Sequence, residues 1–314
     1  MADPSKKRKP GSGRTVRLKR FLPLYLMMLP AFLYLLINNY LPMGGLVLAF
    51  KKYNVQDGIW GSAWAGLSNF TFLLKNRELP ILFRNTLGYN ICFILVNMVL
   101  GVSLAILITE IRNNTFRKMA QSSVLFPFVV SIIIVSYMVR GFLDPEAGLL
   151  NHLLMSLGHK RISWYDKEQY WPFILIFVNT WKSVGYGCIL YISTIMGIDM
   201  SLYESASLDG ASKFQKIRYI TLPFLRPTII TVALLAVGRI FNSDFGLFYQ
   251  VPQGSGLITN VTQTIDTFVY KALTSQSNIG MSAAASFFQS VIGFTMILIF
   301  NTITSKVSKE NALF

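Results

Sequence analysis

Residues 201–223 read Ser-Leu-Tyr-Glu-Ser-Ala-Ser-Leu-Asp-Gly-Ala-Ser-Lys-Phe-Gln-Lys-Ile-Arg-Tyr-Ile-Thr-Leu-Pro, a polar segment between two long apolar runs. Ser201 followed by Glu204 is a capping box and predicts that a helix begins there. Gly210 supplies the left-handed residue that would end this helix. Ser212 followed by Gln215 is a second capping box. The segment therefore predicts two short helices that meet at an angle.

The ends and faces of these two helices point to a docking element. Leu222-Pro223 disfavours continuation of the second helix, and Pro227 can occupy the first turn of the next apolar run. The first helix presents Leu202, Tyr203 and Ala206, an apolar face that it cannot bury alone. Such a helix either docks into another protein or lies on a membrane surface.

The chain around this segment has the composition of a membrane protein. Of 314 residues, 53% are hydrophobic and only 14% are charged, whereas soluble domains carry about 25% charged residues. A membrane crossing needs about 20 apolar residues. Six runs meet this need, and we predict an all-α membrane protein with six transmembrane helices at Phe21–Phe50, Phe83–Thr109, Met119–Leu143, Trp171–Met196, Leu225–Phe248 and Ile279–Thr304. The first run carries three prolines and could instead divide into two crossings.

The basic residues predict the orientation. The loops and tails on one side of the six runs hold 17 Lys and Arg residues, against nine on the other side. Because cytoplasmic loops are enriched in basic residues, both termini are predicted to be cytoplasmic. Residues 1–20 form a basic tail suited to anionic lipid, although Gly11-Ser12-Gly13 resembles an engineered linker and residues 1–13 receive no function. The net charge of +15 suggests nucleic-acid binding, but six apolar runs argue against it.

The segment quoted above resembles a known signature. Glu204-Ser205-Ala206, Gly210, Ile220 and Leu222-Pro223 have the spacing of the EAA motif in permeases of binding-protein-dependent ABC importers. Ser205 departs from the family's alanine, a small-for-small change. The resemblance to carbohydrate-type permeases, such as those for maltose or alginate oligosaccharides, covers most of residues 20–306.

This resemblance implies a fold, a function and a set of partners. It implies the MetI-like permease fold, with residues 21–306 as the permease domain, a core at about 84–306, coupling helices at 201–221 and a cytoplasmic tail at 307–314. The function implied is import of sugars or oligosaccharides across the bacterial cell membrane. The partners implied are a second permease in a heterodimer, two ABC ATPase subunits and an extracytoplasmic solute-binding protein. The residues implied to contact the ATPase are Glu204, Ser205, Ala206, Asp209, Gly210, Ile220, Leu222 and Pro223.

Several functions are disfavoured by what the sequence lacks. It contains no phosphate-binding Gly-rich loop, so ATP and Mg²⁺ are expected on a partner ATPase. No catalytic group is evident, and we expect a transport subunit without bound cofactor. His152 and His159 have no companion ligands at metal-binding spacing, and no metal site is predicted. Two alternatives stay open: an ABC permease for a peptide or polyol, and, less favoured, an ion-coupled carrier.

Polar residues inside the apolar runs are candidates for the substrate path, because ionisable groups in a membrane are costly. The candidates are Asn179, Lys182, Tyr186, Arg239, Asn242 and Asp244. Asn179, Lys182 and Tyr186 share one helix face by their spacing. The basic residues Arg140, Lys182 and Arg239 outnumber Asp244, which favours an anionic oligosaccharide. Alternatively, these groups pair with one another, for example Lys182 with Asp244. They could also extend to the membrane interface by snorkelling.

The polar stretch from Tyr249 to Asn278 is long for a connection between two spans. It could contact the solute-binding protein, or it could be a flexible connector.

Overall fold

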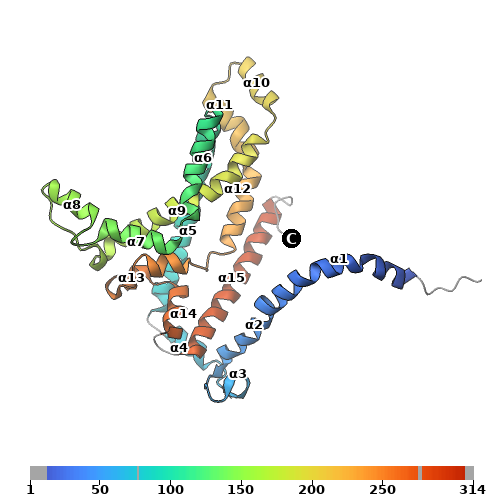
Figure 1. Cartoon of the computed structure of the whole chain (residues 1–314), viewed down its shortest axis with the longest axis vertical. Coiled ribbons are helices and arrows are strands. Elements are labelled where there is room, and N and C mark those ends of the chain that lie inside the picture. Colours follow the sequence, from blue (N-terminus) through green and yellow to red (C-terminus); the bar gives the residue numbers. More distant parts are fainter. Residues whose placement is uncertain (1–12, 76–77, 275–277, 308–314) are drawn as a thin grey trace, which may run out of the picture.

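The computed structural model describes residues 13–75, 78–274 and 278–307, which are mostly helical (Figure 1). The long helices are α1 (Gly13–Leu35), α5 (Leu79–Thr109), α6 (Asn114–Val129), α7 (Ile132–Leu143), α9 (Trp171–Met196), α12 (Leu222–Val237) and α15 (Ile279–Val307). Shorter ones are α2 (Leu41–Met43), α3 (Gly58–Gly61), α4 (Ser68–Lys75), α8 (Leu149–Ser156), α10 (Met200–Leu208), α11 (Lys213–Lys216), α13 (Thr259–Thr262) and α14 (Ile265–Thr274). Strands β1 (Lys51–Lys52) and β2 (Ala63–Trp64) pair antiparallel, with Lys51 opposite Trp64.

Five helical stretches in the described residues are long and apolar enough to cross a membrane. They are 21–50, 79–109, 168–196, 213–237 and 279–306, and the bent pair α6 and α7 makes a sixth if it counts as one crossing. The predicted all-α membrane architecture is therefore confirmed. Residues 1–12 and 308–314 of the two predicted tails lie outside the described residues, and α1 begins at Gly13, inside the predicted N-terminal tail.

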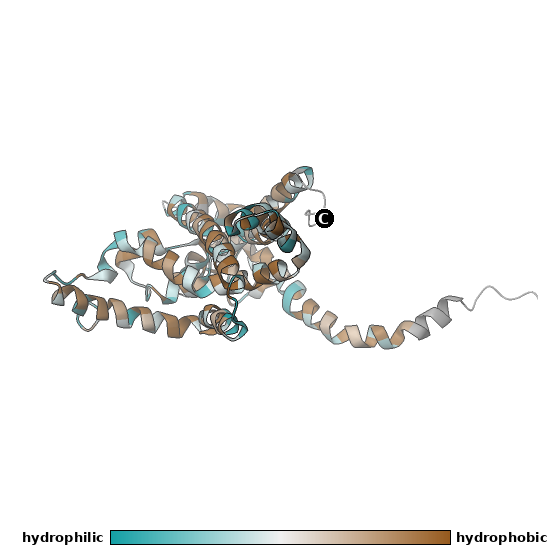
Figure 2. Cartoon of the chain, turned by 90° about the horizontal axis from the view of Figure 1, so that it is seen from above, coloured by the Kyte–Doolittle hydropathy of each residue, from teal (hydrophilic) through white to brown (hydrophobic). Residues whose placement is uncertain are grey.

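Helices α5, α9, α12 and α15 form the body of the molecule, and α1 stands apart from it (Figures 1 and 2). The side chains from Phe21 to Gly44 are all exposed. The 21–50 run is one helical stretch in which π-helical residues Leu36–Tyr40 and a 3-10 turn at Gly44–Phe50 follow α1. The first run is therefore not divided into two crossings.

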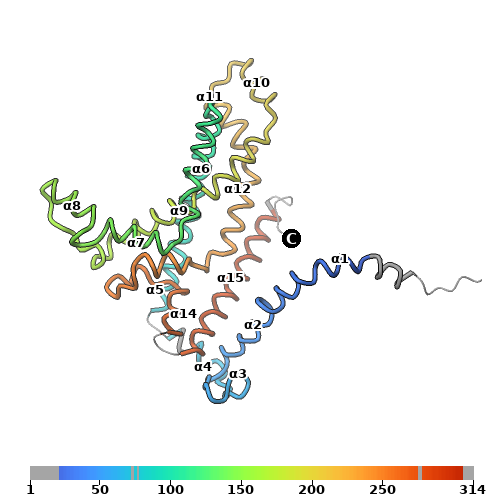
Figure 3. Tube along the Cα trace, viewed as in Figure 1, coloured from blue at the N-terminus to red at the C-terminus, as the bar shows by residue number. Residues whose placement is uncertain are grey.

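The third predicted span is not one helix. α6 ends at Val129, and Val130 and Ser131 are extended, with ψ angles of 129° and 139°. α7 then leaves at 95° to α6, as the trace in Figure 3 shows. The prediction of one continuous helix over Met119–Leu143 is wrong, although the bent pair can count as one crossing, because apolar character alone does not show where a backbone stops being helical.

The fifth predicted span is displaced toward the N-terminus. Helix α11, a π-helical turn at Ile217–Thr221 and α12 run without a break from Lys213 to Val237. The expected end at Leu222-Pro223 is wrong, because the wider π turn immediately before Pro223 accommodates a residue that has no N–H to donate. At the other end, Gly238–Asp244 is not helical, and π-helical residues Gly246–Gln250 follow. We refer to residues 238–244 as the unwound segment.

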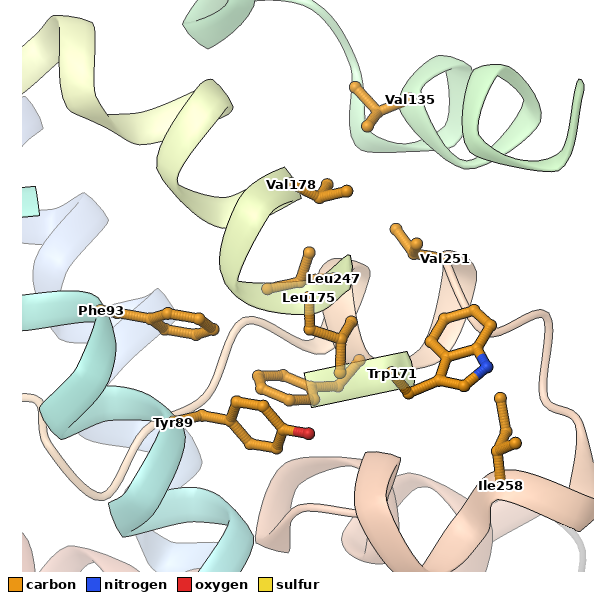
Figure 4. Packing of buried hydrophobic residues seen from close by; sticks show 10 residues of the cluster. Tyr89, Phe93, Val135, Trp171, Leu175, Val178, Leu247, Val251 and Ile258 are labelled. Atoms are coloured by element: carbon orange, nitrogen blue, oxygen red, sulfur yellow. The ribbon is translucent and has the colours of Figure 1, made fainter. Parts of the chain in front are cut away.

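The region after the unwound segment is folded rather than a simple connector. Helices α13 and α14 lie within it, and Val251, Ile258 and Ile265 are buried. Figure 4 shows Trp171 at the start of α9 beside Val251 and Ile258, within a cluster that also contains Tyr89 and Phe93 of α5. Trp171 is fully buried, and its indole nitrogen donates to the Trp164 carbonyl at 2.8 Å. These contacts fix residues 249–262 against α5 and α9.

Candidate functional site

Helix α10 begins two residues earlier than the sequence suggested. Its N-cap is Asp199, whose carboxylate accepts a hydrogen bond from the Ser201 backbone N–H at 2.9 Å. This bond, together with one from the Ser201 side chain, holds the pKa of Asp199 below its usual range. The Ser201 and Glu204 capping box is therefore wrong, because Asp199 satisfies the free N–H groups instead.

The end of α10 is the one predicted. Gly210 has a φ of +76°, in the left-handed region. The Ala211 N–H donates to the Ala206 carbonyl at 2.9 Å, and the Gly210 N–H donates to the Ser207 carbonyl at 3.1 Å. These two bonds form a Schellman motif. The second capping box is also confirmed, since Ser212 and Gln215 bond each other's backbone N–H groups.

Two side-chain bonds tie α10 to the helix that leads into α12. The Tyr203 hydroxyl lies 2.9 Å from the Thr221 hydroxyl, and Thr221 is buried. The Lys216 ammonium donates to the Ser207 hydroxyl at 2.6 Å. Lys213 also lies 3.6 Å from Glu110 at the end of α5, an exposed pair of small energetic value. The position of α10 is thus set by α11 and the π-helical turn, which lead into α12.

The residues of the EAA motif divide into two groups in the structure. Glu204, Ser205, Asp209 and Gly210 are exposed on α10 and its C-terminal turn, and Ala206 is half-buried there. Ile220, Leu222 and Pro223 are half-buried on the helix behind it. Leu208, which the sequence analysis did not single out, is 90% exposed and is the most exposed large apolar side chain among the described residues. Its place beside Asp209 gives the tip of α10 an apolar surface.

Glu204 faces a second feature, a cleft of about 540 Å³ between α10 and the ends of α5 and α9. Its carboxylate forms no hydrogen bond or ion pair with the described residues. Basic side chains line the same cleft, namely Arg112, Arg117, Lys213 and Lys216. Glu204 is thus available to a partner and is not the helix cap that its spacing suggested.

A cleft of about 270 Å³ with polar and apolar lining residues lies between α5, α9, α12 and the unwound segment. We call it the central cleft. Its polar lining residues are Asn90, Asn97, Asn179, Ser183, Arg239 and Asn242. Apolar and aromatic side chains, among them Phe93 and Tyr191, complete the wall. Asn97 of α5 donates to the Asn179 side-chain oxygen at 3.0 Å across the cleft wall. Four amides and a guanidinium can therefore meet a polar solute within the spans.

Three of the six predicted path residues line the central cleft, and three do not. Asn179, Arg239 and Asn242 are in its wall. Lys182 instead donates to the carbonyl oxygens of Phe128 and Val130, and Tyr186 stacks on Phe128 with ring centroids 4.9 Å apart. Both hold the break between α6 and α7. Lys182 forms no pair with Asp244, so that alternative is wrong for the described residues.

Asp244 shapes the chain beyond the cleft. Its carboxylate accepts the Leu247 backbone N–H at 3.2 Å and thereby satisfies an N–H at the start of the next helical turn. This contact is local, and Asp244 is not among the residues that line the central cleft.

The unwound segment is held by side chains from three helices. Asn90 donates to the Ile240 carbonyl at 2.8 Å, and Gln289 of α15 donates to the Phe241 carbonyl at 2.5 Å. Ser243 donates to the Asp266 carboxylate of α14 through both its backbone N–H and its hydroxyl, at 2.7 and 2.6 Å. These bonds replace those that a helix would have made, as a non-helical backbone at this depth requires.

Sequence reasoning missed Asn90 and Asn97. Both lie in the longest apolar helix and are seven residues apart, so they share a face. Two amides on one face of a 31-residue apolar helix are a signal that was available in the sequence.

Known proteins share this architecture. Residues 97–309 match the family described as the binding-protein-dependent transport system inner membrane component. Protein LplB of Bacillus subtilis is 33% identical over 93% of this chain and 92% of its own length. The polygalacturonan/rhamnogalacturonan transport system permease protein YteP of the same organism is 30% identical over 91% of this chain and 89% of its own.

Two solved structures are similar over nearly the whole chain. One is a bacterial ABC transporter involved in the import of the acidic polysaccharide alginate, with a TM-score of 0.85 and 30% identity, covering 93% of this chain and 98% of that one. The other is a bacterial alginate ABC transporter in complex with an alginate pentasaccharide-bound periplasmic protein, with a TM-score of 0.84 and 30% identity. It covers 93% of this chain and 97% of its own.

Proposed function

Because this chain belongs to the family of binding-protein-dependent transport system inner membrane components, we propose that it is the permease subunit of an ATP-driven ABC importer for sugars or oligosaccharides. The observation that carries the saccharide assignment is the central cleft, where four asparagine amides line a space within the spans. An amide both donates and accepts hydrogen bonds, as a sugar hydroxyl does. Aromatic walls such as Phe93 and Tyr191 offer apolar faces to sugar rings.

The names of similar proteins support a saccharide over a peptide, a polyol or an ion. They include transport proteins for polygalacturonan/rhamnogalacturonan, for arabinooligosaccharides and for trehalose/maltose. An ion-coupled carrier would need to hold both halves of its pathway in one chain. Here the central cleft is lined by α5, α9, α12 and the unwound segment of a single chain, and we propose that it is half of a shared pathway.

Coupling to ATP hydrolysis is assigned to α10 and its C-terminal turn. Its exposed carboxylate Glu204, the apolar tip at Leu208 and the Gly210 turn form a surface that no described part of this chain covers. A separate ATPase subunit, which carries ATP and Mg²⁺, would bind this surface. The bonds from Tyr203 and Ser207 to the α12 run provide a rigid connection from the docking surface to the central cleft.

A second permease is the proposed partner for α1 and for the open side of the central cleft. Helix α1 is apolar and contacts no part of the body along Phe21–Leu35, where every side chain is exposed. Lipid can cover such a surface, but a second membrane subunit would also bury it by close packing. A periplasmic binding protein is present in one of the similar structures, and an equivalent extracytoplasmic partner is proposed here.

The orientation of this multi-pass membrane protein is proposed from the basic residues, with both termini in the cytoplasm. Cysteine substitutions at Ser212, near α10, and at His159, after α8, test it directly. In intact cells an impermeant thiol reagent should label only His159→Cys, and inside-out vesicles should reverse the result. Labelling of Ser212→Cys in intact cells would refute the orientation.

The whole proposal is tested by reconstitution. The chain is placed in proteoliposomes with its second permease and ATPase subunits, and uptake of a labelled oligosaccharide is measured with the binding protein. Uptake should require ATP and should stop when the ATPase subunits are omitted. Uptake that persists without ATP would identify a carrier instead.

A further inference from the structure

Arg239 is a guanidinium without a partner in the described part of the chain. It lies at the start of the unwound segment, is exposed, and lines the central cleft. Its side chain forms no hydrogen bond or ion pair with any described residue. The candidate span 213–237 ends two residues before Arg239. The charge at this position is therefore available to an anion that comes from outside the described chain.

The other two basic residues that the sequence analysis grouped with Arg239 already have partners. Lys182 donates to two backbone carbonyls at the α6 and α7 break. Arg140 lies 3.8 Å from Asp144 and donates to the Gln253 side chain at 2.9 Å. Among these three residues, only Arg239 has no partner in the described residues. The residue expected to contact an anion is therefore Arg239 and not Lys182.

The lining of the central cleft does not neutralise Arg239. No aspartate or glutamate is among its lining residues. The nearby carboxylate of Asp266 is engaged by Ser243 and Gln289, and it is not part of the wall. The remaining polar groups in the wall are neutral amides and the hydroxyls of Ser183 and Tyr191. The cleft therefore combines one positive charge with several hydroxyl-binding groups.

The backbone that carries Arg239 is fixed before any ligand arrives. Ile240 and Phe241, the next two residues, have their carbonyls held by Asn90 and Gln289. Gly238, the preceding residue, packs so closely that an added Cβ would lie 3.3 Å from Ile297. A pre-positioned arginine recognises a carboxylate through two parallel hydrogen bonds, and such bonds are stronger where water is scarce.

We propose that the central cleft takes an acidic oligosaccharide, with Arg239 binding the carboxylate of a uronate unit and the asparagines binding its hydroxyls. This rests on the proposed function and names the substrate class of the same site. One of the similar structures is an importer of an acidic polysaccharide. A neutral sugar would leave the Arg239 charge uncompensated, so the cleft should discriminate between charged and uncharged saccharides.

The test compares two ligands that differ in charge. Labelled trigalacturonic acid and its methyl-esterified form are titrated against the complete importer in nanodiscs, in the absence of the binding protein. Arg239→Gln should weaken binding of the acid by about tenfold or more, the usual effect of losing a charged hydrogen-bonding partner, and should change binding of the ester little. Arg239→Lys should fall between, because lysine keeps the charge but loses the paired geometry. Arg140→Gln, outside the cleft, is the matched control.

The outcomes separate this inference from the function on which it rests. Equal weakening of acid and ester, or an unchanged preference in Arg239→Gln, overturns the inference and assigns Arg239 to a carboxylate of the second permease. If ATP-dependent uptake of neutral oligosaccharides is normal while the acid neither binds nor is transported, the inference fails and the proposed function stands. If no saccharide is taken up with ATP, the proposed function fails as well.

Discussion

The ammonium of Lys182 in α9 lies 2.5 Å from the carbonyl oxygen of Val130, at the break between α6 and α7. It also donates to the Phe128 carbonyl at 3.1 Å. Where a helix stops within a membrane, its last carbonyls lose their partners and cannot turn to water. The half-buried Lys182 thus donates to carbonyls that the next helical turn would otherwise have satisfied. In this way α9 stabilises the bend between α6 and α7.

The first prediction is that Lys182→Met destabilises the protein. Removing the ammonium leaves two carbonyls without this donor, and a hydrogen bond to a charged group contributes about 1.5–3 kcal/mol, less where the bond is exposed. The melting temperature of the complex in detergent should fall, whereas Lys160→Met, at an exposed residue, should leave it unchanged. If Lys182→Met melts like the parent but takes up less of an anionic saccharide, Lys182 is a substrate residue after all.

The second prediction concerns Gly185, one turn further along α9. A Cβ built there would overlap the carbonyl oxygen of Val124, which is backbone in α6 and cannot swing aside. Gly185→Ala should therefore force α6 and α9 apart and cost about 1–3 kcal/mol, as overpacking usually does. Gly88→Ala in α5 meets nothing within 4 Å and serves as the control. Thermal unfolding of both variants should show the loss in Gly185→Ala only.

The bend at Val130 also shows what the sequence could not predict. Hydropathy located the apolar run, because crossing a membrane demands apolar residues. The break depends on Lys182, which is 52 residues away from Val130 in the chain, and no local pattern reveals such a pairing. The same limit explains why Lys182 was assigned to the path: helical spacing placed it beside Asn179, but its length lets the ammonium reach another helix.

Local chemistry, by contrast, was predictable. Gly210 ends α10, and Ser212 caps the next helix, because both depend on backbone groups only a few residues away. The prediction that the helix ends at Pro223 was wrong for a related local reason. A proline usually ends a helix, but the π-helical turn before Pro223 accommodates its missing N–H and its ring. Asn90 and Asn97 are also predictable, because two amides seven residues apart share one face of an apolar helix.

The third prediction is that Gly210→Val separates ATP hydrolysis from transport. With a φ of +76°, a β-branched residue at this position should be strained by about 1–2 kcal/mol or more, although an added Cβ would meet no atom within 4 Å. The strain would distort the exposed end of α10. Reconstituted importer should keep basal ATPase activity and lose most uptake.

Gly210→Asn is the matched control for that prediction, because asparagine tolerates the left-handed region. It should retain uptake near the parental level. Equal uptake by the valine and asparagine variants would contradict a coupling role for this turn.

The last prediction tests the connection from α10 to α12. Tyr203→Phe removes one partner of the bond to Thr221 and leaves the buried threonine hydroxyl without it, at a cost of about 0.5–1.5 kcal/mol. If the two helices must move together, uptake per ATP hydrolysed should fall in Tyr203→Phe and by a similar amount in Thr221→Val. The double variant should be no worse than either single variant, because all three lack the same bond. Tyr219→Phe, at an exposed tyrosine, should behave like the parent. Additive losses in the double variant would mean that each residue acts through other contacts and that the bond is not the connection.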